Sequence, residues 1–512
     1  MKNKKLRIMC LTAVLTAVLT SCGSVSPEDF ELSGSGEMTK AETSDSIEVS
    51  GENAVLFKYE NEENNPLITN IFCADPTAVE YNGRLYVYGT NDNQQYLEKG
   101  NKDNTYEMIQ SFVIISTEDM VNWRYEGEVN TKEVAPWIIA SWAPSIVSRE
   151  EADGKTHFYL YFSNSGAGVG VLTSTSPTGP WSDPLGEPLV YAGMEGLDGC
   201  PNPFDPGVCI DDNGTGWLSF GGGTAPDGSK FMPGVARIVK LGSDMLSFDS
   251  EFVKVAAPYF FEASELNYIG GKYLYTYNTS WEGRSEWDES LSDVPPTACS
   301  MAYMSSKTPL ESDSWQYEDY YLKNPGELGM EFSNNHTHLH KFKDKYYLFY
   351  HTLTLQKERG ITKGFRSLGV NEISVDEQNG VINVCEADRT GAAQIQKLDP
   401  YKIHQAEEVY LTDCDFEQSD GSIYAKCDNE KVIAVKGTDF GKGSTGFAAR
   451  VKGSGTLEVR LDGIDGEKLA ALKLDSDDFG VFYSNAEAEG EHDIFFVFDG
   501  EFCFDEWEFT NK

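Results

Sequence analysis

The stretch that decides the fold is Asp75-Pro-Thr-Ala-Val-Glu-Tyr-Asn-Gly-Arg-Leu-Tyr-Val-Tyr, residues 75–88. An acidic residue opens a short strand, Asn82-Gly83 supplies a turn signal, and a strand heavy in aromatic residues follows. Two β-rich runs on either side of such a turn predict a β-hairpin.

The same order of features occurs four more times along the chain. The later copies begin at Trp142, Asp205, Glu262 and His336, and from Asp75 onward the five starts stand 67, 63, 57 and 74 positions apart. This spacing suits a four-stranded blade with long loops, repeated in tandem. The pattern predicts an all-β protein with a five-bladed β-propeller.

The five starting residues are the first candidates for a functional site. The innermost strand of each propeller blade begins near the central channel, so residues far apart in sequence converge there. Four of the five starts are ionisable, whereas a packed channel would call for small or apolar residues. We therefore expect one pocket that contains Asp75, Trp142, Asp205, Glu262 and His336.

Three carboxylates in one pocket suit the hydrolysis of glycosides. One carboxylic acid protonates the leaving oxygen, and one carboxylate activates water or attacks carbon. A third carboxylate beside the acid raises the pKa of that acid by repulsion between like charges. Glu265 is the rival to Glu262 as the acid, but an offset of three along a strand predicts that the two point to opposite faces.

These residues lie in motifs that resemble glycoside hydrolase family 43 over residues 64–398. The matching motifs are Ala74-Asp75-Pro76, Trp142-Ala143-Pro144, Phe204-Asp205-Pro206, Phe261-Glu262-Ala263-Ser264, Asn334-Asn335-His336 and Phe365-Arg366-Ser367. The resemblance implies that Asp75 is the general base, Glu262 the general acid, and Asp205 a pKa modulator that also orients the acid. The family inverts anomeric configuration, which implies acid and base carboxyls roughly 6.5–9.5 Å apart.

Five further roles are expected in or near the pocket. Trp142 either offers a flat face to a sugar ring or closes the channel floor as a core residue. Arg366 resembles a family arginine that donates to substrate hydroxyls, although a structural ion pair is the alternative. His336 is a hydrogen-bond donor, a satisfied channel histidine or, as the family implies, a neighbour of a calcium ion through water. Asn91 and Asp92 are weaker candidates for the same pocket. The chemistry itself requires no cofactor.

The N-terminus predicts export. Residues 1–21 combine basic residues with a short apolar run, which is typical of a signal peptide and too short for a permanent membrane helix. The sequence Leu19-Thr-Ser-Cys22 resembles a lipoprotein cleavage box and predicts a lipid on Cys22, with an ordinary signal peptide as the alternative. Residues 22–59 are expected to form a flexible acidic spacer. The protein would then be anchored by its lipid to the outer face of a bacterial cell membrane.

Charge narrows the choice of partners. The formal net charge is −41, and removal of residues 1–21 takes away four positive charges, leaving −45. Such acidity argues against nucleic acid and anionic lipid surfaces as ligands. It is compatible with a neutral polysaccharide. We expect a monomer, and the scattered cysteines leave open one or two disulfides that sequence does not assign.

The propeller is expected over residues 60–398, followed by a β-sandwich over 402–511. The second region resembles carbohydrate-binding module family 6, whose usual cleft uses two aromatic residues and an asparagine. Here Val432 and Cys503 replace two of these parts, and residues 475–485 contain no tryptophan. The sequence predicts a sandwich that packs against the propeller. Two positions match those that hold structural calcium in that family, namely Glu407 and Asp505.

The combined expectation is an inverting glycoside hydrolase that releases arabinofuranosyl side chains from arabinoxylan or a related hemicellulose. A β-xylosidase or an endo-acting arabinan or xylan hydrolase is the alternative, because the loops that shape the pocket are not readable from sequence. A non-catalytic, surface glycan-binding lipoprotein is the alternative of another class.

Overall fold

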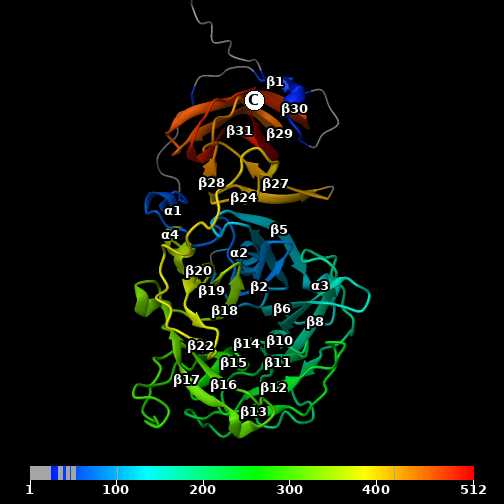
Figure 1. Cartoon of the computed structure of the whole chain (residues 1–512), viewed down its shortest axis with the longest axis vertical. Helices are drawn as coiled ribbons and strands as arrows, with labels where there is room; N and C mark the ends of the chain where they lie inside the picture. Colours follow the sequence, from blue (N-terminus) through cyan, green and yellow to red (C-terminus); the bar gives the residue numbers. More distant parts are fainter. Residues whose placement is uncertain are drawn as a thin grey trace, which may run out of the picture.

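The computed structural model describes residues 25–32, 38–41, 46–47, 54–100, 102–419 and 421–511. The expected signal peptide and Cys22 lie outside these residues. The described chain forms a five-bladed β-propeller and a C-terminal β-sandwich, placed one above the other along the long axis (Figure 1). Within the described residues, no helix is both long enough and apolar enough to cross a membrane.

Each blade is an antiparallel sheet whose first strand lies at the centre of the ring. Blades one to four have four strands, blade five has three, and β24 extends blade one. The strands, in blade order, are β2 (Ala74–Tyr81), β3 (Arg84–Thr90), β4 (Ser111–Thr117) and β5 (Trp123–Asn130); β6 (Trp142–Glu150), β7 (Thr156–Ser163), β8 (Gly168–Ser174) and β9 (Val190–Tyr191); β10 (Gly207–Ile210), β11 (Gly216–Phe220), β12 (Ala236–Lys240) and β13 (Val253–Val255); β14 (Phe260–Ile269), β15 (Lys272–Thr279), β16 (Met301–Ser306) and β17 (Gln316–Leu322); β18 (Thr337–Phe342), β19 (Lys345–Thr352) and β20 (Ser367–Ile373).

Short helices and a small hairpin fill the connections. They are α1 (Phe57–Glu60), α2 (Asp92–Lys99), α3 (Thr131–Val134), α4 (Thr354–Glu358), the 3-10 turns η1 (Pro27–Asp29), η2 (Ser165–Ala167), η3 (Ser312–Ser314) and η4 (Pro325–Leu328), and the strands β21 (Val375–Asp376) and β22 (Val381–Ile382). The ring is closed by the start of the propeller chain, because residues 64–73 run beside β20. The Leu67 amide donates to the Leu368 carbonyl at 2.9 Å, and the Cys73 amide donates to the Arg366 carbonyl at 2.9 Å.

The inner strands of blades one, two and four share a bulge in which two residues oppose one on the next strand. In blades one to four, one residue at this point has a left-handed backbone, with φ of 50° at Asp75, 39° at Ala143, 51° at Asp205 and 58° at Ala263. Bulges of this kind re-aim side chains next to active sites. Here they turn the strand starts into the channel.

The C-terminal region is a β-sandwich with an aromatic core. Its strands are β23 (His404–Gln405), β25 (Leu411–Thr412), β26 (Asp415–Ser419), β27 (Ser422–Cys427), β28 (Val432–Asp439), β29 (Gly446–Leu461), β30 (Glu467–Asn485) and β31 (Glu491–Thr510). β24 (Glu408–Val409) lies between them in the chain but pairs with blade one. Alternate residues face inward, as at Phe447, Ala449 and Val451 of β29, which pack in the core. Val432 is fully buried, so it offers no surface to a glycan.

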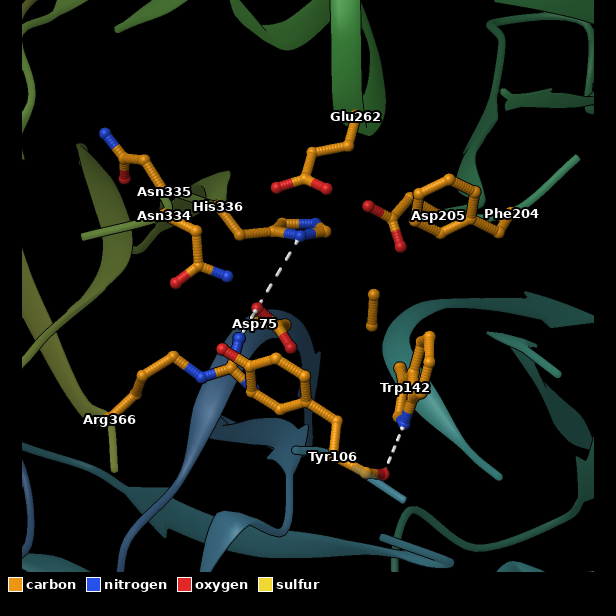
Figure 2. Close-up of a pocket in the computed structure, with 11 residues that line it drawn as sticks. Asp75, Tyr106, Trp142, Phe204, Asp205, Glu262, Asn334, Asn335, His336 and Arg366 are labelled. Carbon is orange, nitrogen blue, oxygen red and sulfur yellow. Dashed lines mark hydrogen bonds and ion pairs between the residues drawn. The ribbon is translucent and has the colours of Figure 1, made fainter. Parts of the chain in front are cut away.

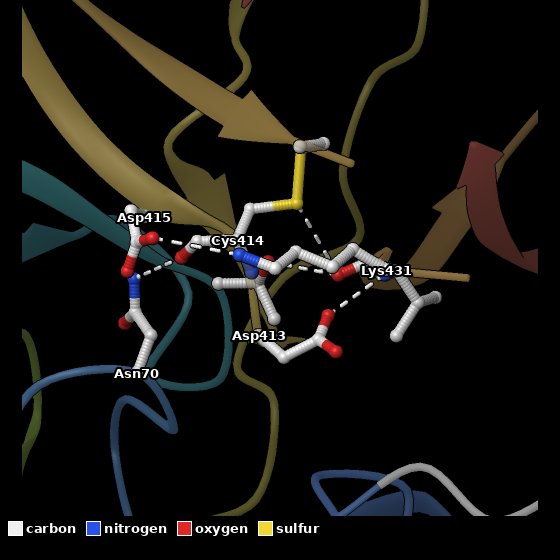
Figure 3. Close-up of a disulfide and its surroundings, with 8 residues drawn as sticks. Asn70, Asp413, Cys414, Asp415 and Lys431 are labelled. Atoms are coloured by element: carbon white, nitrogen blue, oxygen red, sulfur yellow. Dashed lines mark hydrogen bonds and ion pairs between the residues drawn. A yellow bond between two sulfur atoms is a disulfide. The ribbon is translucent and has the colours of Figure 1, made fainter. Parts of the chain in front are cut away.

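The sandwich is joined to blade one by strand pairing and by side chains. β24 pairs with β5, and Arg84 forms an ion pair with Glu408 at 2.8 Å. Phe416 stacks on Tyr125 with ring centroids 5.2 Å apart. A disulfide between Cys414 and Cys427 closes the base of the β26–β27 hairpin that carries Phe416, and the Asn70 amide group donates to the Cys414 carbonyl at 2.9 Å (Figure 3).

The described parts of the expected spacer differ from a solvated chain. β1 (Thr39–Lys40) pairs in parallel with β30, and Val25 is buried against the sandwich. The sequence composition is that of a spacer, but a few apolar side chains among the polar ones suffice to hold it on the sheet.

Candidate active site

The strand starts converge on one pocket at the centre of the propeller (Figure 2). Asp75 comes from blade one, Trp142 from blade two, Asp205 from the loop before β10, Glu262 from blade four and His336 from the loop before β18. The pocket residues are Asp75, Tyr106, Trp142, Ala143, Phe204, Asp205, Glu262, Asn334, Asn335, His336 and Arg366. The five residues predicted to meet there are all among them.

The five starts are not strictly equivalent, however. Asp75 and Asp205 occupy the left-handed position itself, whereas Trp142 and Glu262 come one residue before it. The bulge thus lets two successive positions of an inner strand reach the pocket, which a regular strand with alternating faces would not allow.

The same bulge makes the expected orientation of Glu265 wrong. Between Glu262 and Glu265 the strand gains one residue relative to β15, so an offset of three no longer reverses the face. Glu265 is buried in the channel, with Oε2 at 3.4 Å from His338 Nδ1 and Oε1 at 3.5 Å from Ser145 Oγ. Glu265 does not line the pocket, because its partner on β15 lies two residues beyond that of Glu262, further from the start of the inner strand.

Asp75 is surrounded by cationic and donor groups. Arg366 Nη1 donates to Asp75 Oδ1 at 2.9 Å, His351 Nδ1 lies 3.2 Å from the same oxygen, and His336 Nδ1 lies 3.8 Å from it. Burial alone would raise the pKa of Asp75, but Arg366, His351 and His336 together hold it well below its ordinary value of 3.8. Asp75 is therefore a carboxylate at neutral pH.

Glu262 has the opposite environment. Burial, followed by repulsion from Asp205 and Asp75, raises the pKa of Glu262 from 4.5 to about 8, and Arg366 opposes this only in part. Asp205 is held in place by Ser163 Oγ at 3.1 Å and by the backbone amide of Ala263 at 2.8 Å. Burial also raises the pKa of Asp205. Glu262 is thus a protonated acid near neutral pH beside two other carboxyl groups.

Arg366 and its partners show why two expected pocket residues lie elsewhere. The Arg366 guanidinium donates to Asp92 at 2.7 Å and 2.9 Å, and it lies over the ring of Tyr106 at 4.8 Å. Asp92 is fully buried behind Arg366, and Asn91 caps α2 by accepting from the Gln94 amide at 3.2 Å. The expectation that Asn91 and Asp92 line the pocket is therefore wrong. Their role is to support Arg366 and the helix that follows.

Trp142 forms one wall of the pocket. Its Nε1 donates to the Tyr106 carbonyl at 3.0 Å, and its ring meets that of Tyr106 edge to face at 6.2 Å. The indole is half-buried and lines the pocket with one face, so it is not a core residue that merely closes the channel floor.

Tyr106 and His351 are site residues that the sequence reasoning missed. Tyr106 lies in the long β3–β4 loop, where no repeat marks it. His351 is the second-last residue of β19, the second strand of blade five, and its position follows a pattern visible only in the structure. The side chains of Thr90, Ser163 and His351 each contact the backbone amide of the left-handed residue in the next blade. The sequence did contain a signal for this contact, because a polar residue stands at or next to the end of the aromatic second strand in each of these three blades.

Calcium was expected beside His336 in the channel and, separately, at Glu407 and Asp505 in the C-terminal region. Calcium in proteins takes six to eight oxygen ligands. Across the described ranges of the chain, no group of three or more His, Cys, Asp or Glu residues is placed to hold a metal ion. His336 faces Asp75, Asp505 contacts Arg450, and one oxygen of Glu407 is buried without a hydrogen-bond partner. A calcium ion beside His336, and one held by Glu407 and Asp505, both stay predictions.

Comparisons with known proteins agree with this geometry. Residues 63–381 match the family described as glycosyl hydrolases family 43. The chain belongs to this family. An arabinoxylan arabinofuranohydrolase of Bacillus subtilis is 36% identical over 88% of this chain and 92% of its own length. One from Paenibacillus polymyxa is 34% identical over 87% of this chain and 74% of its own length.

A solved structure of a family 43 protein is similar to this chain over most of its length. The crystal structure of a family 43 arabinoxylan arabinofuranohydrolase from Bacillus subtilis in complex with cellotetraose has a TM-score of 0.80 and 35% identity. The match covers 88% of this chain and 98% of that one, so it includes both the propeller and the C-terminal β region.

Proposed function

We propose that the protein is an arabinofuranosidase that removes arabinofuranosyl side chains from arabinoxylan or a related hemicellulose with inversion of configuration. The observation that carries the proposal is the contrast between two carboxyl groups of one pocket. Asp75 lies against Arg366, His351 and His336, which lower its pKa, whereas Glu262 is buried near Asp205 and Asp75, which raises its pKa. Two groups with pKa values pushed apart are suited to separate acid and base roles. The names of the two relatives with 36% and 34% identity supply the choice of sugar.

In this mechanism, protonated Glu262 donates its proton to the glycosidic oxygen as the bond to the anomeric carbon breaks. Asp75, as a carboxylate, accepts a proton from the water that attacks the same carbon from the other side. Asp205 keeps Glu262 protonated by repulsion, and its hydrogen bonds from Ser163 and Ala263 keep it in position. No step requires a cofactor.

The pocket wall and its rim support a polymeric substrate. The face of Trp142 suits a sugar ring, and His336 and Arg366 present donors to sugar hydroxyls. Beyond the pocket, Trp281 is 46% exposed and Phe332 50% exposed, and their rings meet at 5.5 Å. Phe332 stands two residues before Asn334, which lines the pocket. This aromatic pair would hold the main chain of the polysaccharide while a side chain enters the pocket.

The remaining parts of the proposal concern location and assembly. The protein would be exported, anchored by a lipid on Cys22 to the outer face of the bacterial cell membrane, and monomeric. Its disulfide suits a compartment outside the reducing cytosol. The sandwich would be a relative of carbohydrate-binding module family 6 that serves mainly as a structural partner of the propeller.

The test is the release of sugar from wheat arabinoxylan, followed by chromatography. We expect free arabinose from the wild-type protein and a loss of at least a hundredfold in Asp75→Ala. Proton NMR of the first product should show the inverted anomer. The same assay would also use nitrophenyl xyloside and arabinan. If xylose is the only sugar released from these substrates, the protein is a xylosidase and not an arabinofuranosidase. No release from any substrate would favour the glycan-binding lipoprotein.

A further inference from the structure

The segment that precedes the propeller is laid across the sandwich. We call residues 25–32 and 38–41 the strap. Its apolar side chains pack on the outer face of the β29–β30 sheet, in a cluster made of Val25, Phe30, Leu32 and Met38 against Ala448, Val481 and Tyr483. β1 then pairs in parallel with β30, and the Ala41 amide donates to the Tyr483 carbonyl at 2.9 Å.

Polar contacts hold the strap and the residues that follow it. Glu508, which is 4% exposed, accepts from the backbone amides of Glu31 at 2.5 Å and Leu32 at 2.8 Å. Further along, the Ile47 amide donates to Glu458 at 3.0 Å, and Arg460 donates to the Ile47 carbonyl at 2.5 Å. A segment with the composition of a free spacer is thus held at several points on one domain.

The length of chain between the strap and the proposed lipid is short. Cys22 and Val25 are separated by three Cα steps, which span at most about 11 Å. Val25 itself is only 6% exposed. A lipid on Cys22 therefore has little freedom to move away from the sandwich.

From this distance we propose that the strap fastens the sandwich directly to the lipid surface, with the propeller held on the far side. The proposal rests on the lipid anchor of the proposed function. The strap and β1 lie at the end of the molecule opposite the propeller, and the sandwich joins the outer edge of blade one (Figure 1). The pocket at the centre of the ring then opens to the side, parallel to the membrane.

Two cationic side chains lie over one aromatic ring on the outer face of the sheet beyond the strap. Arg450, which pairs with Val481 of the strap cluster, lies over the ring of Phe479 at 4.6 Å, and Lys452 lies over the same ring at 4.8 Å. Arg450 also forms an ion pair with Asp505, and the strap itself carries Glu28, Asp29 and Glu31. The attachment of this face to the bilayer therefore rests on the lipid and the short chain that joins it to the strap, and not on attraction between the protein and charged headgroups.

The first experiment is neutron reflectometry of the lipidated protein on a supported bilayer. We expect protein density to begin within about 11 Å of the headgroups. Val25→Asp combined with Phe30→Asp should release residues 25–32 and widen the gap to roughly 20 Å, the mean span of some fifteen flexible residues between Cys22 and β1. A gap of that size in the wild type, or one unchanged in the double variant, overturns the inference. Activity on nitrophenyl arabinofuranoside controls for folding.

Hydrogen exchange on the soluble chain that begins at residue 23 tests the strap without any lipid. The amides of Glu31 and Leu32 should be protected in the wild type and exchange at least tenfold faster in Glu508→Ala. They should be unchanged in Asp499→Ala, an exposed carboxylate on the same strand. Unprotected amides in the wild type would contradict the strap. An unmodified Cys22 in mass spectrometry would remove the lipid surface as partner, while arabinose release would stand.

Discussion

Glu262 and Asp75 differ in what surrounds them, and this difference supports their proposed roles as acid and base. The Glu262→Gln variant cannot donate a proton, so its loss should depend on how much help the leaving group needs. We expect a loss of about a hundredfold or more in kcat/KM on arabinoxylan and a much smaller loss on nitrophenyl arabinofuranoside. In the wild type, activity should fall as pH rises through about 8, because Glu262 then loses its proton. Equal losses on both substrates would exclude Glu262 as the acid.

We expect Asp205 to influence this pH dependence through its charge. Asp205→Asn removes a negative charge beside Glu262, so the pKa of Glu262 should fall and the alkaline limb of the pH–rate profile should move to lower pH. The profile of kcat/KM between pH 5 and 10 measures this. Asp227→Asn, an exposed carboxylate, is the matched control and should leave the limb in place. An unmoved limb in Asp205→Asn would remove the modulator role.

Sequence predicted the pocket residues better than their orientation. The five strand starts were readable because polar residues interrupt an aromatic, hydrophobic repeat. The roles of Asn91 and Asp92 were not, since a polar pair after a strand looks the same whether it lines a pocket or supports an arginine. His351 was hidden in a run of aromatic strand residues. Its function depends on the amide of Asp75, which is remote in sequence and adjacent only in the closed ring.

At the scale of elements, the bulge in β14 positions Glu262. Ala263 has φ of 58°, a conformation that a β-branched residue adopts only with strain. Ala263→Val should lower the free energy of unfolding by about 1–3 kcal/mol and displace Glu262, with most activity lost. Ala263→Gly should keep the bulge and the activity. Thermal unfolding and kinetics on nitrophenyl arabinofuranoside check both. A fully active valine variant would show that the bulge does not position the acid.

The loops that carry Trp281 and Phe332 should matter only for a polymer. Trp281→Ala removes a face on which a main-chain sugar can stack, and we expect kcat/KM on arabinoxylan to fall about tenfold. Activity on nitrophenyl arabinofuranoside, which has no main chain, should be unchanged. The ratio of the two rates is the measurement. Val294→Ala, an exposed apolar residue in the same β15–β16 connection, serves as control. Parallel losses on the two substrates would instead indicate a distorted pocket.

Sequence patterns predict the regular strands of this protein correctly, but they do not predict the β-bulges that interrupt them. The hairpins follow from alternation and turn residues, which are local. The bulges arise from the packing of five inner strands around one axis, a constraint that no single blade contains. For that reason Glu265 was expected on the wrong face, although its strand was correctly expected.

At the scale of the whole molecule, the propeller and the sandwich should unfold together. β24 belongs to the sheet of blade one, and Phe416 stacks on Tyr125 of the propeller. We expect a single transition in differential scanning calorimetry. Phe416→Ala should lower the melting temperature by several degrees or split the transition, because it removes a half-buried ring from the junction. Phe479→Ala, on the outer face of the sandwich, should leave one transition. Two transitions in the wild type would mean independent domains.

The closure of the ring by residues 64–73 has a consequence for the order in which the protein matures. Asp75 stands in the first blade, yet its partner Arg366 comes 291 residues later. A chain that emerges from the ribosome, or threads through a translocon, completes four blades before Asp75 meets Arg366, the arginine that lowers the pKa of its carboxyl group. Catalysis therefore begins only with the last blade. Until then the growing chain carries the parts of a hydrolase without being one.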